Sequence, residues 1–188
     1  MRNNKRLMAF LQLLKETAMR CGEALRLKWT DIDFVKNAVR VSPEKGSSPR
    51  IIKISNRLAA MLNSLPKDNE RVFNVTYDAI RKSFDRQRKK LARKLQNPRI
   101  RQITFHTFRH WKATMEYAKT KDILHVMRLL GHKNINNTLI YTQLVDFKSD
   151  DYISKVARNA EEACQLVEAG FEYVCTTPEN LMIFRKRK

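Results

Sequence analysis

The spacing of apolar side chains along the chain predicts mostly helix. In several stretches apolar residues recur every three or four positions, which gives a helix one buried face. The predicted helices cover residues 5–18, a short segment capped by Ser55, residues 76–95, residues 104 to about 118, a segment from Thr120 to Gly131, and residues 138–142.

The pattern changes to short extended runs at residues 32–34, 39–41 and 51–54. Turn-forming residues separate these runs, so we expect a three-stranded antiparallel meander. Lys45 then lies at the tip of the second hairpin, beside Gly46. The expected fold class is α+β, mainly helical, with one small sheet.

The last part of the chain predicts a separate appendage. Apolar positions from Tyr152 to Val167 have helical spacing and end at Gly170, and residues 171–176 and 181–184 are predicted strands. We therefore divide the chain into residues 1–150 and a tail, 151–188, made of a helix and a hairpin.

Within the predicted helices, the same spacing selects the side chains that should face the core. We expect the inward residues to be Tyr77, Ile80, Phe84, Leu91 and Leu95 in the long helix, then Phe105, Phe108 and Met115, then Ile123, Leu124, Met127 and Leu130.

The net charge narrows the class of partner. Lys and Arg number 38 against 19 Asp and Glu, a formal charge of +19. Such an excess favours a polyanionic partner, with double-stranded DNA as the first candidate. No 18-residue apolar run and no signal peptide occur in the sequence, so we expect no membrane partner and a cytoplasmic location on nucleoid DNA, or in the host cytoplasm if the protein is viral.

The sequence holds few candidates for metal or cofactor chemistry. Cys21, Cys164 and Cys175 are widely spaced, which is typical of free thiols in a reducing compartment. We find no zinc-ligand spacing and no glycine-rich phosphate loop, and we expect neither a metal nor another cofactor.

The predicted helix over residues 76–95 is strongly basic. A charge run is usually a solvated face, but such faces mix signs, and here we see only Asp85 among the positive charges. We expect this helix to contact DNA phosphates through Arg81, Lys82, Arg86, Arg88, Lys89, Lys90, Arg93 and Lys94.

A second polar set could surround one small anion. His106 and Arg109 share a helical face, His132 follows the helix-ending Gly131, and Tyr141 comes nine residues later. Singly, each has an ordinary explanation: a buried tyrosine, a capping histidine, or an ion pair between Arg20 and Glu23. Cleavage of a phosphodiester by a side chain needs the whole combination. A tyrosine nucleophile must lose a proton, guanidinium groups must stabilise charge on the phosphate oxygens, and an acid must protonate the leaving oxygen.

These residues, taken in order, resemble the tyrosine recombinases, or phage-type integrases, over residues 5 to about 145. The motifs are Arg20-x-x-Glu23-Ala24-Leu25, Leu27-x-Trp29-x-Asp31, the hairpin Lys45-Gly46, His106-x-x-Arg109-His110, Leu130-Gly131-His132, and Tyr141. The tail is similar, more weakly, to tails of archaeal integrases.

The resemblance implies a role for each matched residue. Tyr141 would attack the scissile phosphate, forming a 3′-phosphotyrosyl link and a free 5′-hydroxyl. Arg20 and Arg109 would clamp the non-bridging oxygens, Lys45 would protonate the leaving oxygen with help from His106, and His132 would hydrogen-bond the phosphate. Glu23 would hold Arg20 rather than touch the substrate. His110 follows Arg109 in the family pattern and would be a supporting residue without contact to the substrate.

The sequence departs from the family pattern in three places. Ala18 stands where members often have glycine. The hairpin lacks the usual second basic residue soon after Lys45 and has Ser47-Ser48-Pro49-Arg50 instead. Lys53 is a distant rival for the role of Lys45. The N-terminal domain that closes a clamp around DNA is not included in these residues, so we expect a catalytic domain alone.

We therefore expect site-specific DNA recombination, by integration or excision, including that of viral genomes. The alternatives are a type IB-like topoisomerase and a non-catalytic DNA-binding module. The resemblance further implies a tetramer on DNA and a monomer or weak oligomer in its absence.

Overall fold

The computed structural model describes residues 2–44, 46–143 and 152–187. The chain forms two compact units, Met1–Val145 and Asp146–Lys188, and each is described by itself.

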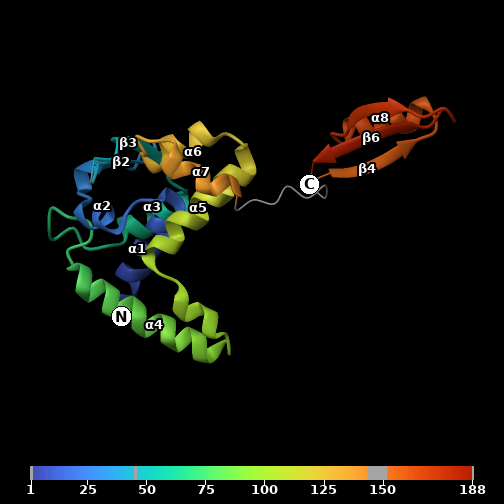
Figure 1. Cartoon of the computed structure of the whole chain (residues 1–188). Helices are drawn as coiled ribbons and strands as arrows, with labels where there is room; N and C mark the ends of the chain where they lie inside the picture. The colour runs from blue at the N-terminus through green and yellow to red at the C-terminus, as the bar shows by residue number, and fades with distance from the viewer. Residues whose placement is uncertain (1, 45, 144–151, 188) are drawn as a thin grey trace. The chain divides into compact units, whose positions relative to one another are not determined.

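The first unit is the mainly helical α+β fold that the sequence predicts (Figure 1). Its sheet is a meander in which the central strand pairs antiparallel with both others, Val39 with Ile32 and with Ile52. The elements in order are α1 (Arg2–Thr17), α2 (Cys21–Arg26), the 3-10 helix η1 (Trp29–Asp31), β1 (Ile32–Asp33), β2 (Ala38–Val41), β3 (Arg50–Lys53), α3 (Asn56–Asn63), α4 (Tyr77–Lys94), η2 (Pro98–Gln102), α5 (Phe105–Thr120), α6 (Ile123–Leu130) and α7 (Asn136–Gln143).

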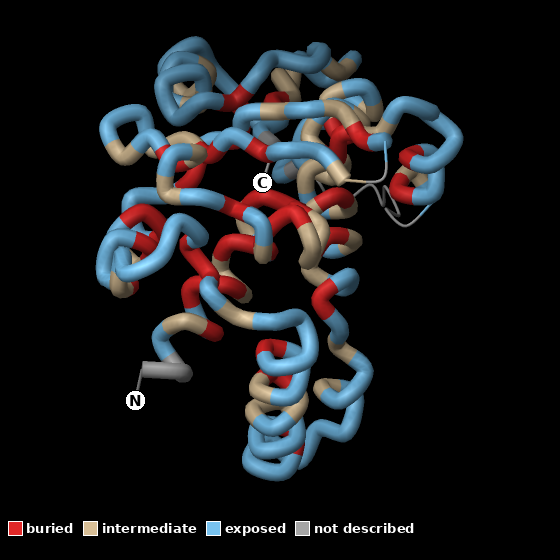
Figure 2. The backbone as a smooth tube through the Cα atoms, turned by 90° about the vertical axis from the view of Figure 1, so that its left-hand side faces the viewer, coloured by how far each residue is buried: buried red, intermediate tan, exposed pale blue. Residues whose placement is uncertain are grey.

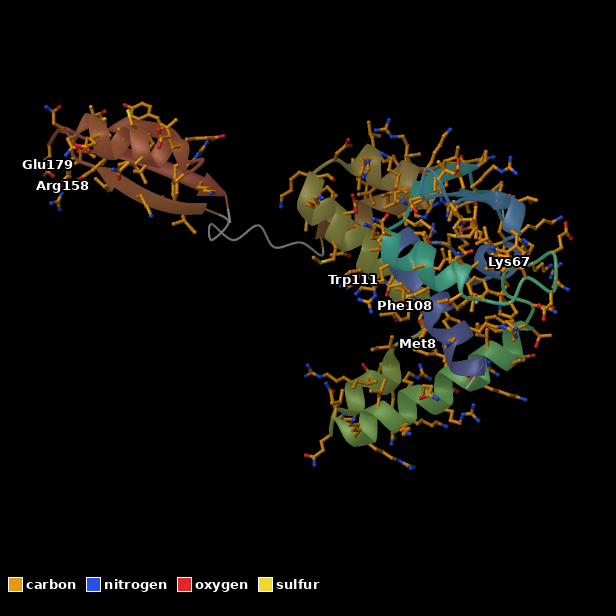
Figure 3. All side chains as sticks on the ribbon, turned by 180° about the vertical axis from the view of Figure 1, so that it is seen from behind. Met8, Lys67, Phe108, Trp111, Arg158 and Glu179 are labelled. Atoms are coloured by element: carbon orange, nitrogen blue, oxygen red, sulfur yellow. The ribbon has the colours of Figure 1, made fainter. Side chains whose placement is uncertain are left out.

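Helix α1 lies at the centre of the main core and packs against α3, α4 and α5. Phe10 is fully buried, with its ring edge-on to Phe73 at 5.1 Å and to Phe105 at 5.5 Å between centroids. The buried positions gather in the interior segments of the tube in Figure 2. Figure 3 labels Met8 and Trp111, which remain about half exposed on α1 and α5.

A smaller core joins α5, α6 and α7. Ala113, Val126, Leu130 and Tyr141 are buried here together with Ala18, which follows α1. This cluster contains the predicted nucleophile, so the packing of three helices sets the position of the tyrosine ring.

The start of α6 differs from the prediction. Thr120 is the last residue of α5, and Lys121 ends that helix in the left-handed conformation with φ of 56°. Asp122 caps α6 instead, because its carboxylate accepts hydrogen bonds from the backbone N–H groups of Leu124 and His125. An aspartate satisfies these free donors as well as a threonine does.

Several predicted core positions are exposed. Leu124 is 55% exposed and Met115 49%, and Val126 takes the buried position in α6. In α4, Ile80, Phe84 and Ala92 are buried, whereas the remaining predicted members, Tyr77, Leu91 and Leu95, are exposed. The sequence places apolar residues on more than one face of these helices, and spacing alone does not decide which face is covered.

The second unit contains β4 (Tyr152–Ala157), α8 (Ala160–Glu168), β5 (Glu172–Thr176) and β6 (Met182–Arg187), with strand order β4-β6-β5, all antiparallel. The predicted helix over residues 152–170 was wrong in its first part. Asn159 caps α8, so the helix begins at Ala160. Residues 152–157 instead pair with β6 along its length and help to enclose Phe171 and Phe184. Among the described residues no helix is long and apolar enough to cross a bilayer.

Candidate active site

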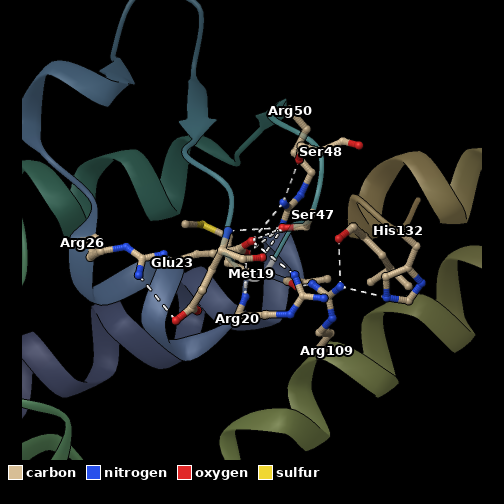
Figure 4. Close-up of polar contacts among 12 residues, drawn as sticks. Met19, Arg20, Glu23, Arg26, Ser47, Ser48, Arg50, Arg109 and His132 are labelled. Atoms are coloured by element: carbon tan, nitrogen blue, oxygen red, sulfur yellow. Dashed lines mark hydrogen bonds and ion pairs between the residues drawn. The ribbon is translucent and has the colours of Figure 1, made fainter. Parts of the chain in front are cut away.

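Arg109 is a buried charged group of the predicted site, with 2% of its surface exposed. Its guanidinium donates from Nη1 to the carbonyl oxygen of Ala18 at 2.6 Å and from Nη2 to that of Leu130 at 2.8 Å (Figure 4). Leu130 ends α6, where carbonyls lack helical partners. Ala18 adopts a φ of 54°, which turns the chain after α1. The arginine therefore ties α5 to the ends of two other helices.

His132 follows Gly131, which ends α6 with a φ of 70°. Its Nε2 lies 3.1 Å from Arg109 Nη2, and its Nδ1 lies 3.0 Å from the hydroxyl of the buried Thr138. A guanidinium can only donate, so Nε2 accepts and Nδ1 carries the proton. Burial and the neighbouring guanidinium groups, first that of Arg109, lower the pKa of His132 to about 4. The ring is therefore neutral at pH 7.

Glu23 is 2% exposed and holds the first arginine in place. Its carboxylate accepts the backbone N–H of Arg20 at 2.9 Å, and Nη1 of Arg20 lies 3.5 Å away. Arg50 binds it with two nitrogens, at 2.7 and 3.2 Å, and the Ser47 hydroxyl donates at 3.2 Å. Burial alone would raise the pKa of Glu23, but these bonds, first that of Arg50, hold it below its usual value.

The network carries more positive than negative charge. Arg20, Arg50 and Arg109 face one carboxylate, that of Glu23. Burial and the other two arginines lower the pKa of Arg109 to about 10, which still leaves it charged at pH 7. An anion bound here would be stabilised, because it would offset this excess.

The β2–β3 hairpin is attached to the same site. The backbone N–H of Ser48 donates to the carbonyl of Gly131 at 3.0 Å. The Cβ atom of any side chain at Gly131 would lie 2.9 Å from the backbone carbonyl oxygen of Ser48 and 2.9 Å from Arg50 Nη1. The close approach therefore requires glycine. The hairpin is thereby joined to the residue before His132.

Tyr141 lies in α7 and is 2% exposed. Its hydroxyl is 3.1 Å from Nδ1 of His110, and the His106 ring stands edge-on to that of His110 at 4.5 Å. Burial lowers the pKa of both histidines, as do nearby charges. Burial raises the pKa of Tyr141, although Arg109 and Arg20 act in the opposite direction.

The structure thus brings together most of the predicted site from segments far apart in sequence. The residues that meet are Arg20, Glu23, His106, Arg109, His110, His132 and Tyr141. Lys45 lies outside the described residues. Its rival Lys53 pairs with Ala38, at the opposite end of β3 from the hairpin tip, which does not support the rival assignment.

Sequence analysis missed Arg50, Ser47 and Thr138. In the sequence, Arg50 was noted only as a basic residue some distance after Lys45. Its side chain is 6% exposed and binds Glu23 more closely than the side chain of Arg20 does. A buried carboxylate with only one nearby cation would have been the signal to look for a second.

The basic face of α4 reaches one side of the site. A cavity of about 380 Å³ lies between α2, α4 and α5 and is lined by Arg20, His106, Tyr77 and Arg81 among others. Of the predicted DNA-binding residues, Arg88 is engaged within the fold, where it contacts Asp85 and the carbonyl of Ile103. The others are exposed: Arg81, Lys82, Arg86, Lys89, Lys90, Arg93 and Lys94.

Residues 2–147, most of the chain, match the Phage integrase family. The chain belongs to this family. The tyrosine recombinase XerA of Saccharolobus solfataricus is 28% identical over 156 residues, which cover 81% of this chain and 51% of that protein. The tyrosine recombinase XerA of Pyrococcus horikoshii is 30% identical over 173 residues, 88% of this chain and 57% of that protein. The chain spans about half the length of these integrase relatives.

Solved structures agree with the family assignment. A crystal structure of XerA recombinase matches with a TM-score of 0.60 and 27% identity, over 76% of this chain and 55% of that one. The catalytic domain of bacteriophage HP1 integrase, 21% identical, shares the fold with a TM-score of 0.54 over 77% of this chain and 84% of that one. The described residues of this chain hold no group of three or more His, Cys, Asp or Glu suited to a metal ion.

Proposed function

We propose that this chain is the catalytic part of a site-specific DNA recombinase that cuts and rejoins strands through Tyr141. The observation that carries the proposal is the excess of positive charge in the network of Arg20, Arg50 and Arg109, beside a tyrosine hydroxyl. A tyrosine next to a site for one anion suits transfer of a phosphodiester to that hydroxyl.

In this proposal Oη of Tyr141 bonds to the scissile phosphorus, and the bond to the 5′ oxygen breaks. Arg20 and Arg109 stabilise the charge on the non-bridging oxygens, since guanidinium groups bind such oxygens and stay protonated. His132 adds a hydrogen bond once its proton has moved from Nδ1, which faces Thr138, to Nε2. Lys45, assisted by His106, protonates the 5′ oxygen. Glu23 supports Arg20. The phosphotyrosyl ester retains the energy of the broken bond, so rejoining to another 5′-hydroxyl needs no cofactor.

The DNA duplex would lie against the first unit. Residues 146–188 contain seven Lys and Arg and eight Asp and Glu, which leaves 31 and 11, a net charge of +20, for residues 1–145. The exposed basic residues of α4 would contact phosphates beside the site. Binding should weaken steeply with salt, because each neutralised phosphate releases counterions.

The relatives support DNA as the partner. A XerH site-specific recombinase of this fold, 22% identical, was solved bound to its palindromic difH substrate in a post-cleavage complex. We extend to this chain the assembly that the family resemblance implies, a tetramer on DNA, within the cytoplasm on nucleoid or viral DNA.

The test is covalent capture from a random pool. Duplexes with a random 30-base-pair region and a central nick in one strand release a short fragment after cleavage near the nick, which traps the adduct. We expect the wild-type chain to capture a related set of sequences and Tyr141→Phe to capture none. Tyr173→Phe is the matched control, because this tyrosine is exposed in the second unit.

Three outcomes contradict the proposal. If Tyr141→Phe forms as many adducts as the wild-type chain, Tyr141 is not the nucleophile. Salt-sensitive binding without any adduct would indicate a non-catalytic DNA-binding module. Adducts spread over unrelated sequences, together with plasmid relaxation, would indicate a topoisomerase.

A further inference from the structure

The hydroxyl of Tyr141 has a hydrogen-bonding partner that the family resemblance does not assign to it. Nδ1 of His110 lies 3.1 Å from Oη, so this predicted supporting residue directly contacts the reacting atom of the tyrosine. His110 lies on α5 and Tyr141 on α7, two helices that pack against each other. The contact is therefore a product of tertiary packing.

Among the described residues, the other two histidines of the site make no hydrogen bond to Tyr141. Both ring nitrogens of His132 have partners, Arg109 and Thr138. The His106 ring stands edge-on to His110, with 82° between the two planes. Of the three, His110 is the one placed to exchange a proton with the tyrosine.

Electrostatics favours a neutral ring at His110. Burial and then the charge of Arg109 lower its pKa, so the imidazole has one free lone pair at pH 7. Burial raises the pKa of Tyr141, so the phenol keeps its proton in the resting protein. In the tautomer that has its proton on Nε2, the phenol O–H donates to an unprotonated Nδ1. The arginines would then stabilise the phenolate once the proton has moved.

We infer that His110 is a catalytic residue, the base that takes the phenolic proton of Tyr141 as the tyrosine attacks phosphorus. The inference rests on the proposed function. The O–H bond of Tyr141 breaks and Nδ1–H forms; Oη bonds to phosphorus, and the bond to the 5′ oxygen breaks with a proton from the acid on that side. On rejoining, His110 returns its proton to Oη as the tyrosine leaves.

The first experiment uses the free protein and needs no DNA. Nitrogen-15 NMR of the histidine rings reports which nitrogen carries the proton. We expect Nδ1 of His110 to be unprotonated at pH 7. We also expect Tyr141→Phe to raise the pKa of His110, because the lost O–H donor favoured the neutral ring. A proton on Nδ1 in the resting protein would overturn the inference.

The second experiment measures single-turnover adduct formation on a duplex captured from the random pool. Asparagine at position 110 can still accept a hydrogen bond near the site of Nδ1 but cannot take up the proton. We expect His110→Ala and His110→Asn each to slow the step by about 100-fold, within the usual range for general base catalysis. His125→Asn is the matched control, since His125 lies on α6 and binds Glu116.

Two further readouts distinguish a general base from a residue that only positions Tyr141. In both variants the rate should rise with pH where the wild-type rate is level, and added imidazole should restore part of the rate of His110→Ala. A His110→Asn variant with the wild-type rate and pH profile would show that the residue only positions Tyr141. Circular dichroism and DNA affinity, expected to be unchanged, check that the variants fold.

Tyr141→Phe distinguishes this inference from the proposed function. If that variant forms no adduct while both His110 variants react at the wild-type rate, tyrosine is the nucleophile and His110 is not its base. If Tyr141→Phe still forms adducts, the proposed function fails and the base assignment fails with it.

Discussion

The two halves of the candidate site are built differently. One half, here called the arginine network, comprises Arg20, Glu23, Arg50, Arg109 and His132, and several hydrogen bonds hold each buried member (Figure 4). The other half, here called the tyrosine pair, comprises Tyr141 and His110, and one hydrogen bond joins its polar atoms.

This difference separates stability from reactivity. The arginine network satisfies main-chain carbonyls at the ends of α1 and α6, so its members belong to the fold before any DNA arrives. The tyrosine pair contributes a proton path that the fold does not need. Substitutions in the first half should therefore affect both folding and chemistry. Loss of a hydrogen-bonding atom in the second half should affect mainly chemistry.

Arg109→Lys should give the largest combined effect. One lysine nitrogen cannot reach the carbonyls of both Ala18 and Leu130, so buried acceptors lose their donors. We expect the free energy of unfolding to fall by about 4 kcal/mol and adduct formation to become undetectable. Urea unfolding and the capture assay measure the two. Tyr141→Phe is the comparison, and its free energy of unfolding should fall by roughly 1 kcal/mol or less. Equal losses of stability in the two variants would contradict the difference between the two halves of the site.

Glu23→Gln should come next. It keeps the shape of the side chain but leaves the guanidinium of Arg50, which is 6% exposed, without its counter-ion. We expect a loss of about 3 kcal/mol in the free energy of unfolding. Glu44→Gln is the control, because the Arg26–Glu44 pair is partly exposed and should contribute roughly 1 kcal/mol or less. A Glu23→Gln loss no larger than that of the control would argue against a buried network.

The pH dependence of stability should reveal His132. Its pKa is about 4 in the folded chain, below the ordinary 6.5, so the unfolded chain takes up the proton first. The contribution is complete above pH 6.5 and is lost as the pH falls toward 4. After discounting for partial exposure, we expect His132→Gln to remove about 1 kcal/mol of the acid-induced loss. Urea unfolding at pH 7 and pH 4.5 gives this difference, and parallel behaviour of both proteins would refute it.

Ala18→Gly should have the smallest effect. Relief of the left-handed conformation, worth about 1 kcal/mol for a residue with a side chain, nearly cancels the loss of a buried methyl group, about 0.8 kcal/mol. We expect thermal unfolding to show a change within about 0.5 kcal/mol and adduct formation to be unaltered. A large change in either would mean that Ala18 positions Arg109 through more than its carbonyl.

Local signals in the sequence accounted for much of the fold. The predicted caps at Ser55 and Thr104 each accept a backbone hydrogen bond at the start of a helix, and the turn residues delimited the meander. Such signals act between residues close in sequence, so they can be read without the fold. The helical spacing of residues 152–157 gave a wrong prediction because these residues pair with β6, which lies about thirty residues away in the sequence. A local pattern does not report such a distant partner.

By itself, the sequence determined the family. It also predicted the residue types of the site: two arginines, three histidines, a lysine, a glutamate and a tyrosine at characteristic intervals. Only the tertiary structure decided their partners. Glu23 binds Arg50 across 27 positions, Arg109 reaches Ala18 across 91, and Tyr141 meets His110 across 31. Interactions over such separations depend on how helices pack, and packing places a side chain beside a group to which no local pattern connects it.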